Sequence, residues 1–467
     1  MKKYQLWFTL LSAALTIFLA QGFMNALVWV YLIPLFVVIL NTNTKKAIFC
    51  MVLYGSLVTL FSFWWVKYYS THILILAWLF FTTFHIALSL LIKRSIKNMG
   101  FLEVFVPPAI WILLYHILSI MPLDNFWINL GMFHSQAAPI IWYIGSLGIT
   151  FLIILFNSSI AFFIAKKKKA YLAITMIITI IMVSCFVYSD KKLPEGKRVK
   201  IALIQGNFPQ TWGYRVENAK TELYTTYKEL TYEAIKQKPG LVIWPEYSIP
   251  IDIFKDEMFS KEFTNFTRTL NKDIIIGTLE ELDNKTHYDT ALIFLEDSEE
   301  VLIYKSVMPV PYEKNTKGYY KLETIKTPLG KMGILMCYEE TQPEIARAHV
   351  NNGAELLIAL SNNNRFKESN GLFLTSLYST VTASENGKYV TRVTNTGITQ
   401  IVNPQGKIVG KINSNSRGIL VAEVYLNDHK TFYTKYGNVL VNITVALIII
   451  IVIKRSYIAR KKHNLLL

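Results

Sequence analysis

The sequence predicts an α-helical membrane bundle of eight spans that carries an α/β domain. Residues 4–188 form an almost continuous apolar tract, residues 193–432 read like a soluble protein, and residues 438–453 are apolar again. Over the whole chain 52% of the residues are hydrophobic and only 17% are charged, whereas soluble domains carry roughly 25% charged residues. A globular domain is therefore inserted before the last membrane segment.

The apolar tract divides into runs long enough to cross a hydrocarbon core of ~30 Å. We expect spans near residues 5–20, 24–41, 47–66, 72–92, 101–121, 138–165, 170–188 and 437–453. A signal peptide is the alternative for the first run, but a second span follows at once and no small-x-small cleavage site is clear. The predicted domains are a seven-span membrane domain (1–190), a soluble domain (193–432), an eighth transmembrane helix (437–453) and a basic cytoplasmic tail (454–467).

Basic residues orient these spans, because Lys and Arg are enriched in cytoplasmic loops. Such residues follow the second, fourth and sixth spans, while the alternate loops have almost none. The clusters are Lys45-Lys46, Lys93-Arg94-Lys97 and Lys166–Lys169. With the N-terminus in the cytoplasm, seven spans place residues 193–432 on the extracytoplasmic side.

The net charge of +16 does not indicate a nucleic-acid partner. Sixteen Lys and Arg residues lie in loops and tails beside apolar segments, which leaves the soluble part close to neutral. Cys50, Cys185 and Cys337 are too scattered for a disulfide framework, so Cys337 is either an inert buried residue or a working thiol. No CxxC, HExxH or phosphate-binding glycine loop occurs, so neither a metal nor a cofactor is expected.

Within residues 193–432, short β-branched runs alternate with helical patterns, which predicts an α/β sandwich in one domain. Strands are expected at 199–205, 241–244, 273–278, 290–295, 301–304, 331–336, 355–360, 389–394, 398–402 and 418–424. Helices are expected at 218–236, 260–270 and 372–386, and Asn403-Pro404-Gln405-Gly406 predicts a hairpin turn.

Three polar residues of this domain each follow an apolar strand. Glu246 comes after 241–244, Lys305 lies between 301–304 and a Pro-rich loop, and Cys337 follows 331–336. Taken singly, each has a plain structural explanation: a carboxylate at a strand end, a solvated lysine, and a small buried hydrophobe.

Together the three residues favour catalysis, because the carboxyl ends of strands gather ligands in α/β sheets. A thiolate nucleophile needs a base or a cation beside it. Glu246 can accept the thiol proton of Cys337, while Lys305 can lower the thiol pKa and stabilise the oxyanion of a tetrahedral intermediate.

The ordered motifs resemble the nitrilase superfamily of Glu-Lys-Cys enzymes, and the flanking spans resemble one branch of it, the apolipoprotein N-acyltransferases. The residues that carry the resemblance are Trp244-Pro245-Glu246, Tyr304 with Lys305 and Glu313, Cys337-Tyr338-Glu339, Gln205-Gly206-Asn207 with Pro209-Gln210, Thr394-Asn395-Thr396-Gly397-Ile398-Thr399, and, in the membrane part, Trp142 and Gly145-Ser146-Leu147-Gly148.

The resemblance implies a nitrilase-like αββα sandwich, with Glu246 as general base, Lys305 as oxyanion stabiliser and Cys337 as nucleophile. Supporting residues implied by it are Glu313, Glu339 and Tyr338, and substrate-binding residues are Trp212 and Asn395. The implied reaction is ping-pong: Cys337 takes an acyl chain from a phospholipid as a thioester, and the N-terminal amine of a diacylglyceryl-cysteine lipoprotein accepts it. The implied setting is the bacterial cytoplasmic (inner) membrane, where the enzyme acts as a monomer with these two partners.

Three segments depart from the family pattern. The usual Ser-Asn-Asp before Trp-Phe is Ser361-Asn362-Asn363-Asn364-Arg365-Phe366, the usual Pro-Phe-Gly-Glu is Val310-Pro311-Tyr312-Glu313, and Trp111 is followed by Ile-Leu-Leu-Tyr115-His116 where Glu and Arg are common. These changes leave the three catalytic positions intact and bear on selectivity for the acyl donor and the lipoprotein.

Two other functions remain as alternatives. A membrane-anchored amidase would use the same residues to hydrolyse a carbon–nitrogen bond, and a small polar pocket would favour it. A transporter or receptor with a non-catalytic domain would carry polar residues at span centres, yet residues 1–192 hold only Glu103, Asp124 and Asp190 as acids.

Apolar and aromatic residues near the motifs predict either a lid or membrane-dipping arm, or ordinary core and surface positions. They are Trp212, Tyr214, Phe254, Met258 and Phe259.

Overall fold

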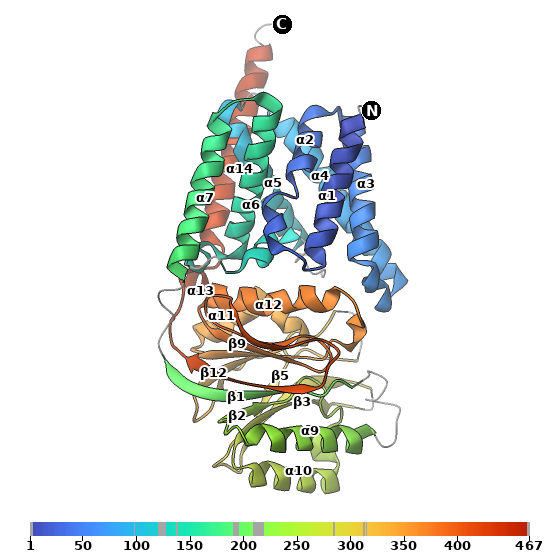
Figure 1. The fold of residues 1–467 in the computed structure, drawn as a ribbon, viewed down its shortest axis with the longest axis vertical. Helices are drawn as coiled ribbons and strands as arrows, with labels where there is room; N and C mark the ends of the chain where they lie inside the picture. The colour runs from blue at the N-terminus through green and yellow to red at the C-terminus, as the bar shows by residue number, and fades with distance from the viewer. Residues whose placement is uncertain are drawn as a thin grey trace. The chain divides into compact units, whose positions relative to one another are not determined.

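A computed structural model of the chain describes residues 3–97, 99–119, 128–136, 139–189, 196–208, 219–283, 285–311, 313 and 315–464. The chain divides into two compact units, residues 1–190 with 436–467, and residues 191–435. The first unit is helical and the second is an α/β sandwich (Figure 1).

The first unit consists of apolar helices joined by short turns. Its helices are α1 (Lys3–Ala20), α2 (Ile33–Asn41), α3 (Thr44–Ser62), α4 (Thr71–Ser95), α5 (Val106–Leu118), α6 (Ile141–Lys166), α7 (Ala170–Ser189) and α14 (Val439–Asn464), with the 3-10 turns η1 (Asn25–Trp29), η2 (Trp64–Tyr68), η3 (Gly100–Phe105) and η5 (Leu130–His134).

Within the described residues, six helices are long and apolar enough to cross a membrane. They are Thr44–Ser62, Thr71–Ser95, Gly100–Leu118, Ile141–Lys166, Ala170–Val187 and Val439–Ile458. The apolar helices Tyr4–Ala20 and Asn25–Asn41 are shorter. The structure therefore supports a multi-span bundle. Six of the eight expected spans correspond to helices long enough to cross a membrane.

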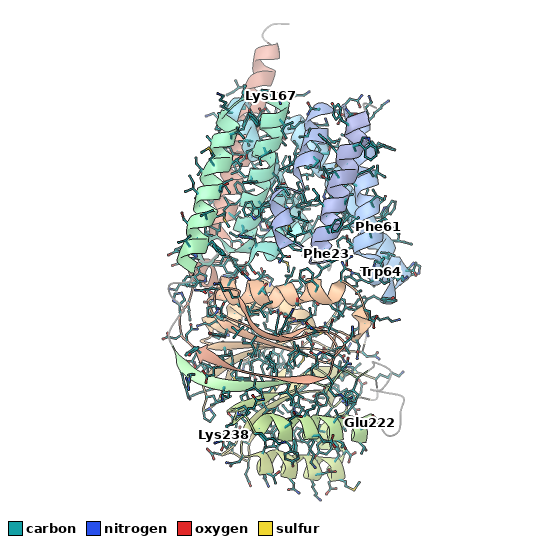
Figure 2. All side chains as sticks on the ribbon, viewed as in Figure 1. Phe23, Phe61, Trp64, Lys167, Glu222 and Lys238 are labelled. Carbon is teal, nitrogen blue, oxygen red and sulfur yellow. The ribbon has the colours of Figure 1, made fainter. Side chains whose placement is uncertain are left out.

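The two ends of this unit differ in side-chain type. Figure 2 shows Phe23, Phe61 and Trp64 near one end and Lys167 at the other. Phe23 and Phe61 are exposed on the surface of the unit. Exposed aromatic residues at one end and lysines at the other are typical of the two interfaces of a membrane bundle.

Buried polar side chains of α6 tie the bundle together. Asn157 accepts a hydrogen bond from the Leu32 N–H at 3.1 Å and donates to the Val28 carbonyl at 3.2 Å, so it closes the irregular backbone before α2. Gly145, with φ 65°, interrupts α6 at the Gly145-Ser146-Leu147-Gly148 motif. This motif therefore shapes the bundle, because freed backbone groups in an apolar medium must find partners.

The second unit contains two six-stranded sheets. Its strands are β1 (Lys197–Gln205), β2 (Leu241–Ile243), β3 (Asp273–Glu281), β4 (His287–Phe294), β5 (Val301–Lys305), β6 (Ile325–Lys326), β7 (Lys331–Met336), β8 (Leu356–Ser361), β9 (Tyr389–Thr394), β10 (Thr399–Val402), β11 (Ile408–Ile412) and β12 (Gly418–Leu426). The sheet orders are β12-β1-β2-β3-β4-β5 and β11-β10-β9-β8-β7-β6. The pairs β1–β2, β2–β3, β7–β8 and β8–β9 are parallel.

Helices cover the outer face of each sheet. The helices and turns of this unit are α9 (Ala219–Ile235), α10 (Glu257–Leu270), α11 (Pro343–Asn351), α12 (Gly371–Asn386) and α13 (Phe432–Tyr436), with η6 (Ile253–Lys255), η7 (Cys337–Thr341) and η8 (Asn364–Phe366). Figure 1 shows α9 and α10 beneath the first sheet and α11 and α12 above the second, an αββα arrangement.

Apolar side chains fill the space between these four layers. Ile201, Ile243, Ile334 and Ile358, from the central strands of both sheets, belong to one buried cluster between the sheets. Separate clusters lie under the helices on each side. Alternation along each strand directs successive side chains into different layers, and this decides which residues reach the site between the sheets.

The expected strands and helices of this unit all occur, and the hairpin turn is present, with the Gly406 N–H donating to the Asn403 carbonyl at 2.9 Å. The sequence did not predict β6, β11, α11 or the five-residue helix α13. β6 has only two residues, β11 is a largely exposed edge strand, and α11 is a nine-residue helix opened by Pro343.

Candidate active site

Cys337 lies at a sharp turn directly after the parallel strand β7. Its φ is 50°, a left-handed conformation that a side-chain-bearing residue rarely adopts. The thiol is free and half-buried, and it is hydrogen-bonded to the Glu246 carboxyl group. Backbone strain of this kind gathers at functional sites because it fixes a side chain in a productive direction.

Glu246 is held from two sides. The backbone of Pro245 and Glu246 passes so close to Gly277 of β3 that a Cβ there would lie 2.5 Å from the Glu246 Cα. The Asn362 N–H, at the end of β8, donates to Glu246 Oε2 at 2.8 Å. Glu246 is therefore positioned by the end of β2, the middle of β3 and the end of β8, and only 3% of the residue is exposed.

Burial and neighbouring negative charges raise the pKa of both Glu246 and Cys337. The pKa of Glu246 is raised well above its usual range, first by loss of solvent and then by Asp289 and Glu313. The pKa of the Cys337 thiol is also raised, first by loss of solvent and then by Glu246, Glu313 and Asp289. A carboxylate with a raised pKa is a stronger proton acceptor, which suits it to take the thiol proton.

The structure does not bring Lys305 to this pair. Its ammonium group lies 2.8 Å from Glu280 Oε1 and 5.4 and 5.2 Å from the ring centres of Tyr288 and Tyr319. The neighbouring Tyr304 points into the cluster between the sheets, so strand alternation turns Lys305 toward the opposite face of the first sheet. The expected convergence of carboxylate, ammonium and thiol is thus observed only for the carboxylate and the thiol.

Ser306, one residue further, lies on the inner side in its place. It is fully buried, and its hydroxyl donates to Glu339 Oε1 at 3.1 Å. Glu339 is the acceptor for four further donors: the Tyr304 hydroxyl and the backbone N–H groups of Met336, Val307 and Met308. Despite these bonds, burial raises the pKa of Glu339 to about 7. Glu339 thus joins the loop after β5 to the turn that bears Cys337.

Two further carboxyl groups, those of Glu313 and Asp289, act on the Cys337 thiol through their charge. Glu313, expected to support Lys305, instead pairs with Arg365 at 2.9 Å. Asp289 of β4 is 2% exposed and accepts a hydrogen bond from the Tyr247 hydroxyl, which also lies 3.0 Å from His287 Nε2. The sequence reasoning missed Asp289 and His287, because both lie on an antiparallel strand without a motif. Their i, i+2 spacing, on one face of a strand, was the available signal.

Asn395, expected to bind substrate, has its amide bonded within the domain. It accepts from the Phe208 N–H at 2.9 Å and donates to the Phe208 carbonyl at 2.8 Å and to Asn362 Oδ1 at 3.1 Å. Asn362 in turn holds Glu246. The structure therefore gives Asn395 a bracing position behind Glu246.

The Ser361–Phe366 departure also has a structural counterpart. Asn363 Oδ1 accepts from the fully buried Arg392 guanidinium at 2.9 Å, and Arg392 pairs with Glu340 at 2.9 Å. The neutral Asn363 amide therefore binds the Arg392 guanidinium, whose positive charge the Glu340 carboxylate already balances.

The remaining expected site residues are spread over different environments. Tyr338 is partly exposed in η7 beside Cys337, and Trp212 and Tyr214 lie outside the described residues. Phe259 is buried under the first sheet, so it belongs to the core. Phe254 and Met258 are exposed, as a lid or arm requires. Among the described residues, no group of three or more His, Cys, Asp and Glu side chains could hold a metal ion.

Each of the two units matches a known family. Residues 11–159 match the apolipoprotein N-acyltransferase N-terminal domain, and residues 200–432 match the carbon-nitrogen hydrolase family. The second match contains Glu246, Lys305 and Cys337.

Curated relatives match this chain along most of their length. The apolipoprotein N-acyltransferase of Thermotoga maritima is 25% identical over 471 residues, covering 93% of this chain and 90% of that protein. Those of Geobacter metallireducens and Aquifex aeolicus are 26% and 27% identical, covering 71% and 74% of this chain and 70% and 81% of those proteins. Among solved structures, Saccharomyces cerevisiae Nit3, a nitrilase-superfamily member, is 24% identical with a TM-score of 0.42, covering 50% of this chain and 92% of that one.

Proposed function

We propose that this chain, which belongs to the apolipoprotein N-acyltransferase family, transfers a fatty acyl chain from a membrane phospholipid to the N-terminal amine of diacylglyceryl-cysteine lipoproteins. The observation that carries the proposal is the hydrogen bond between Cys337, on its strained turn, and the buried Glu246. The family gives the reaction class, and this pair supplies the nucleophile and the base.

The first half-reaction forms a thioester. Glu246 takes the proton of the Cys337 thiol, and the sulfur attacks the ester carbonyl of the phospholipid. The tetrahedral intermediate then expels the glycerol oxygen, which takes the proton back from Glu246. The products are acyl-Cys337 and a lysophospholipid.

The second half-reaction returns the thiol. The lipoprotein α-amine attacks the acyl-Cys337 carbonyl, and Glu246 accepts a proton from the attacking nitrogen. The carbon–sulfur bond of the thioester then breaks, and the Cys337 sulfur regains this proton from Glu246. An amide bond now joins the acyl chain to the lipoprotein. No cofactor enters either step.

The oxyanion of both intermediates needs a donor. Lys305 remains our sequence-based hypothesis for this role, and it requires the ammonium group to leave Glu280 and turn to the inner side of the first sheet. In the structure this ammonium group is paired with Glu280 at 2.8 Å.

The proposed setting is the bacterial cytoplasmic (inner) membrane. We propose that eight spans anchor the chain, that residues 193–432 lie on the extracytoplasmic side, and that the enzyme works as a monomer. Basic residues in alternate loops support the orientation. A membrane anchor suits an enzyme with two lipid substrates, because both reach the site by lateral diffusion.

Mass spectrometry of the purified protein tests the mechanism. After incubation with phospholipid vesicles, the peptide bearing Cys337 is expected to carry a fatty acyl mass that a diacylglyceryl peptide then removes. Cys337→Ser should lose both events, while Cys185→Ser serves as the matched control. N-acylation that persists in Cys337→Ser would end the proposal.

The carbon-nitrogen hydrolase match favours one alternative, hydrolysis of an amide by the same thiol. Water would then attack the acyl-Cys337 in place of the amine. Release of free fatty acid at the same rate with and without a lipoprotein peptide would support the hydrolase, whereas loss of the acyl group from Cys337 that requires the peptide amine and yields the N-acyl peptide supports acyl transfer.

A further inference from the structure

The Cys337 site contains more negative groups than the proposed chemistry uses. Three carboxyl groups act on the thiol, Glu246 by a hydrogen bond and Asp289 and Glu313 through their charge. Glu313 is paired with Arg365, whose side chain is 41% exposed. Asp289 is 2% exposed and has a separate set of partners. The question is what a buried aspartate contributes beside the general base.

Asp289 is fixed by two side chains, Tyr247 and His287. The Tyr247 hydroxyl donates its single proton to Asp289 Oδ1. The contact of 3.0 Å between the Tyr247 oxygen and His287 Nε2 must then be donated by the imidazole. His287 Nε2 also lies 3.6 Å from Asp289 Oδ1. The Tyr247 hydroxyl therefore holds the Asp289 carboxyl group directly, and the imidazole of His287 holds the Tyr247 hydroxyl in turn.

Tyr247 links this group to the base by the backbone. It directly follows Glu246 and has a φ of 53°, which is strained for a residue with a side chain. This conformation brings its ring toward β4, where it meets His287 with ring centres 6.3 Å apart. The same turn thus places Glu246 toward Cys337 and Tyr247 toward Asp289.

We propose that Asp289 is a positioning residue of the acyl-transfer site: bonded to the Tyr247 hydroxyl, it fixes the turn that presents Glu246 to the Cys337 thiol and places a carboxylate beside that pair. The inference rests on the proposed role of Cys337 and Glu246. It assigns a purpose to three residues that no motif includes.

The charges around Glu246 define the expected effect. Asp289 and Glu313 both oppose its ionisation, while hydrogen bonds from Cys337 and from the Asn362 N–H favour it. Arg365 and His287 act on Glu313 and favour its ionised form. Loss of the Asp289 charge should therefore lower the pKa of Glu246, and also that of the Cys337 thiol, which the same charge raises.

The test is the pH dependence of Cys337 alkylation by iodoacetamide, followed by mass spectrometry of the Cys337 peptide in the full-length protein. Asp289→Asn keeps an acceptor for Tyr247 and removes the charge, so the midpoint of the pH–rate curve should fall by about one pH unit. The matched control is Asp297→Asn, at an exposed position between β4 and β5, which should leave the midpoint in place. Asp289→Glu should restore a midpoint close to that of the unaltered protein.

An Asp289→Asn protein that is folded and has an unchanged midpoint would overturn the proposal. Where Asp289→Asn does not fold, Tyr247→Phe removes one donor to Asp289 and should shift the midpoint in the same direction by a smaller amount; an unshifted Tyr247→Phe then overturns it. The reagent needs no lipid, so these results stand apart from the acyl-transfer assay. A normal Asp289 effect in a protein that forms no acyl-Cys337 would reject the proposed function alone.

Discussion

Tyr304 and Lys305 are consecutive residues of β5, and they point to opposite faces of its sheet. The Tyr304 hydroxyl donates to Glu339 Oε2 at 2.8 Å between the two sheets, whereas the Lys305 ammonium donates to Glu280 Oε1 at 2.8 Å on the other side. Pleating places alternate side chains on one face, so the inward neighbour of Tyr304 is Ser306. This relationship separates Lys305 from the Cys337–Glu246 pair.

Lys305→Met and Glu280→Gln distinguish the two positions of the ammonium group. Because we propose Lys305 as the oxyanion donor, Lys305→Met should slow acyl-Cys337 formation by about a hundredfold or more. Glu280→Gln loses only a partly exposed ion pair, so it should keep acyl-Cys337 formation within about threefold of the unaltered rate and lower the unfolding free energy by at most about 1 kcal/mol. Single-turnover acylation measures the first quantity and urea unfolding the second. A loss of about a hundredfold or more in Lys305→Met alone would show that the ammonium group turns toward Cys337 during the reaction.

Glu339→Ala is expected to destabilise the sandwich and to stop acylation. The substitution leaves five donors without their acceptor, and unpaired buried donors should lower the unfolding free energy by about 3 kcal/mol or more. Ser306→Ala is the matched control, because it removes one of the five and should cost about 1 kcal/mol. Urea unfolding gives both values, and equal stabilities for the two variants would contradict the bridging role of Glu339.

The buried imidazole of His349 should make the folded domain lose stability in mild acid. Burial lowers the pKa of this imidazole to about 4, from an ordinary value near 6.5. Between these values the unfolded chain takes up a proton that the folded domain refuses, so stability present above pH 6.5 is lost as the pH falls toward 4. The loss should approach about 3 kcal/mol.

His349→Gln removes this titration and should flatten the fall in unfolding free energy between pH 6.5 and 4. Urea unfolding at several pH values measures the slope. Carboxyl groups elsewhere titrate equally in both proteins and cancel in the comparison. Parallel curves for the two proteins would rule out His349 as the source.

The sequence predicted Glu246 and Cys337 as neighbours, and a hydrogen bond joins them, since Glu246 lies three residues after β2, Cys337 directly follows β7, and the ends of such parallel strands meet. The position of Lys305 required the pleat of β5 as well, and the adjacent Tyr304 carries that information. Asp289 was beyond reach of the motif argument, because its role depends on the strained backbone of Tyr247 and on the register of β4 against β3. The expected number of spans is met by length at six places, because the apolar helices Tyr4–Ala20 and Asn25–Asn41 are shorter than the six others.

Asn395→Ala separates a bracing role from substrate binding. The Asn395 amide bonds to Phe208 and to Asn362, and the Asn362 N–H holds Glu246 Oε2. Loss of the amide should loosen Glu246 and slow acyl-Cys337 formation about tenfold, with little change in the phospholipid concentration that gives half the maximal rate. Single-turnover acylation over a range of phospholipid content in mixed micelles measures both quantities. Asn364→Ala, in the same loop region but outside these hydrogen bonds, is the control and should be close to the unaltered protein. A large rise in the half-saturating concentration with an unchanged maximal rate would instead assign Asn395 to the lipid, because a residue that only binds substrate affects ground state and transition state alike.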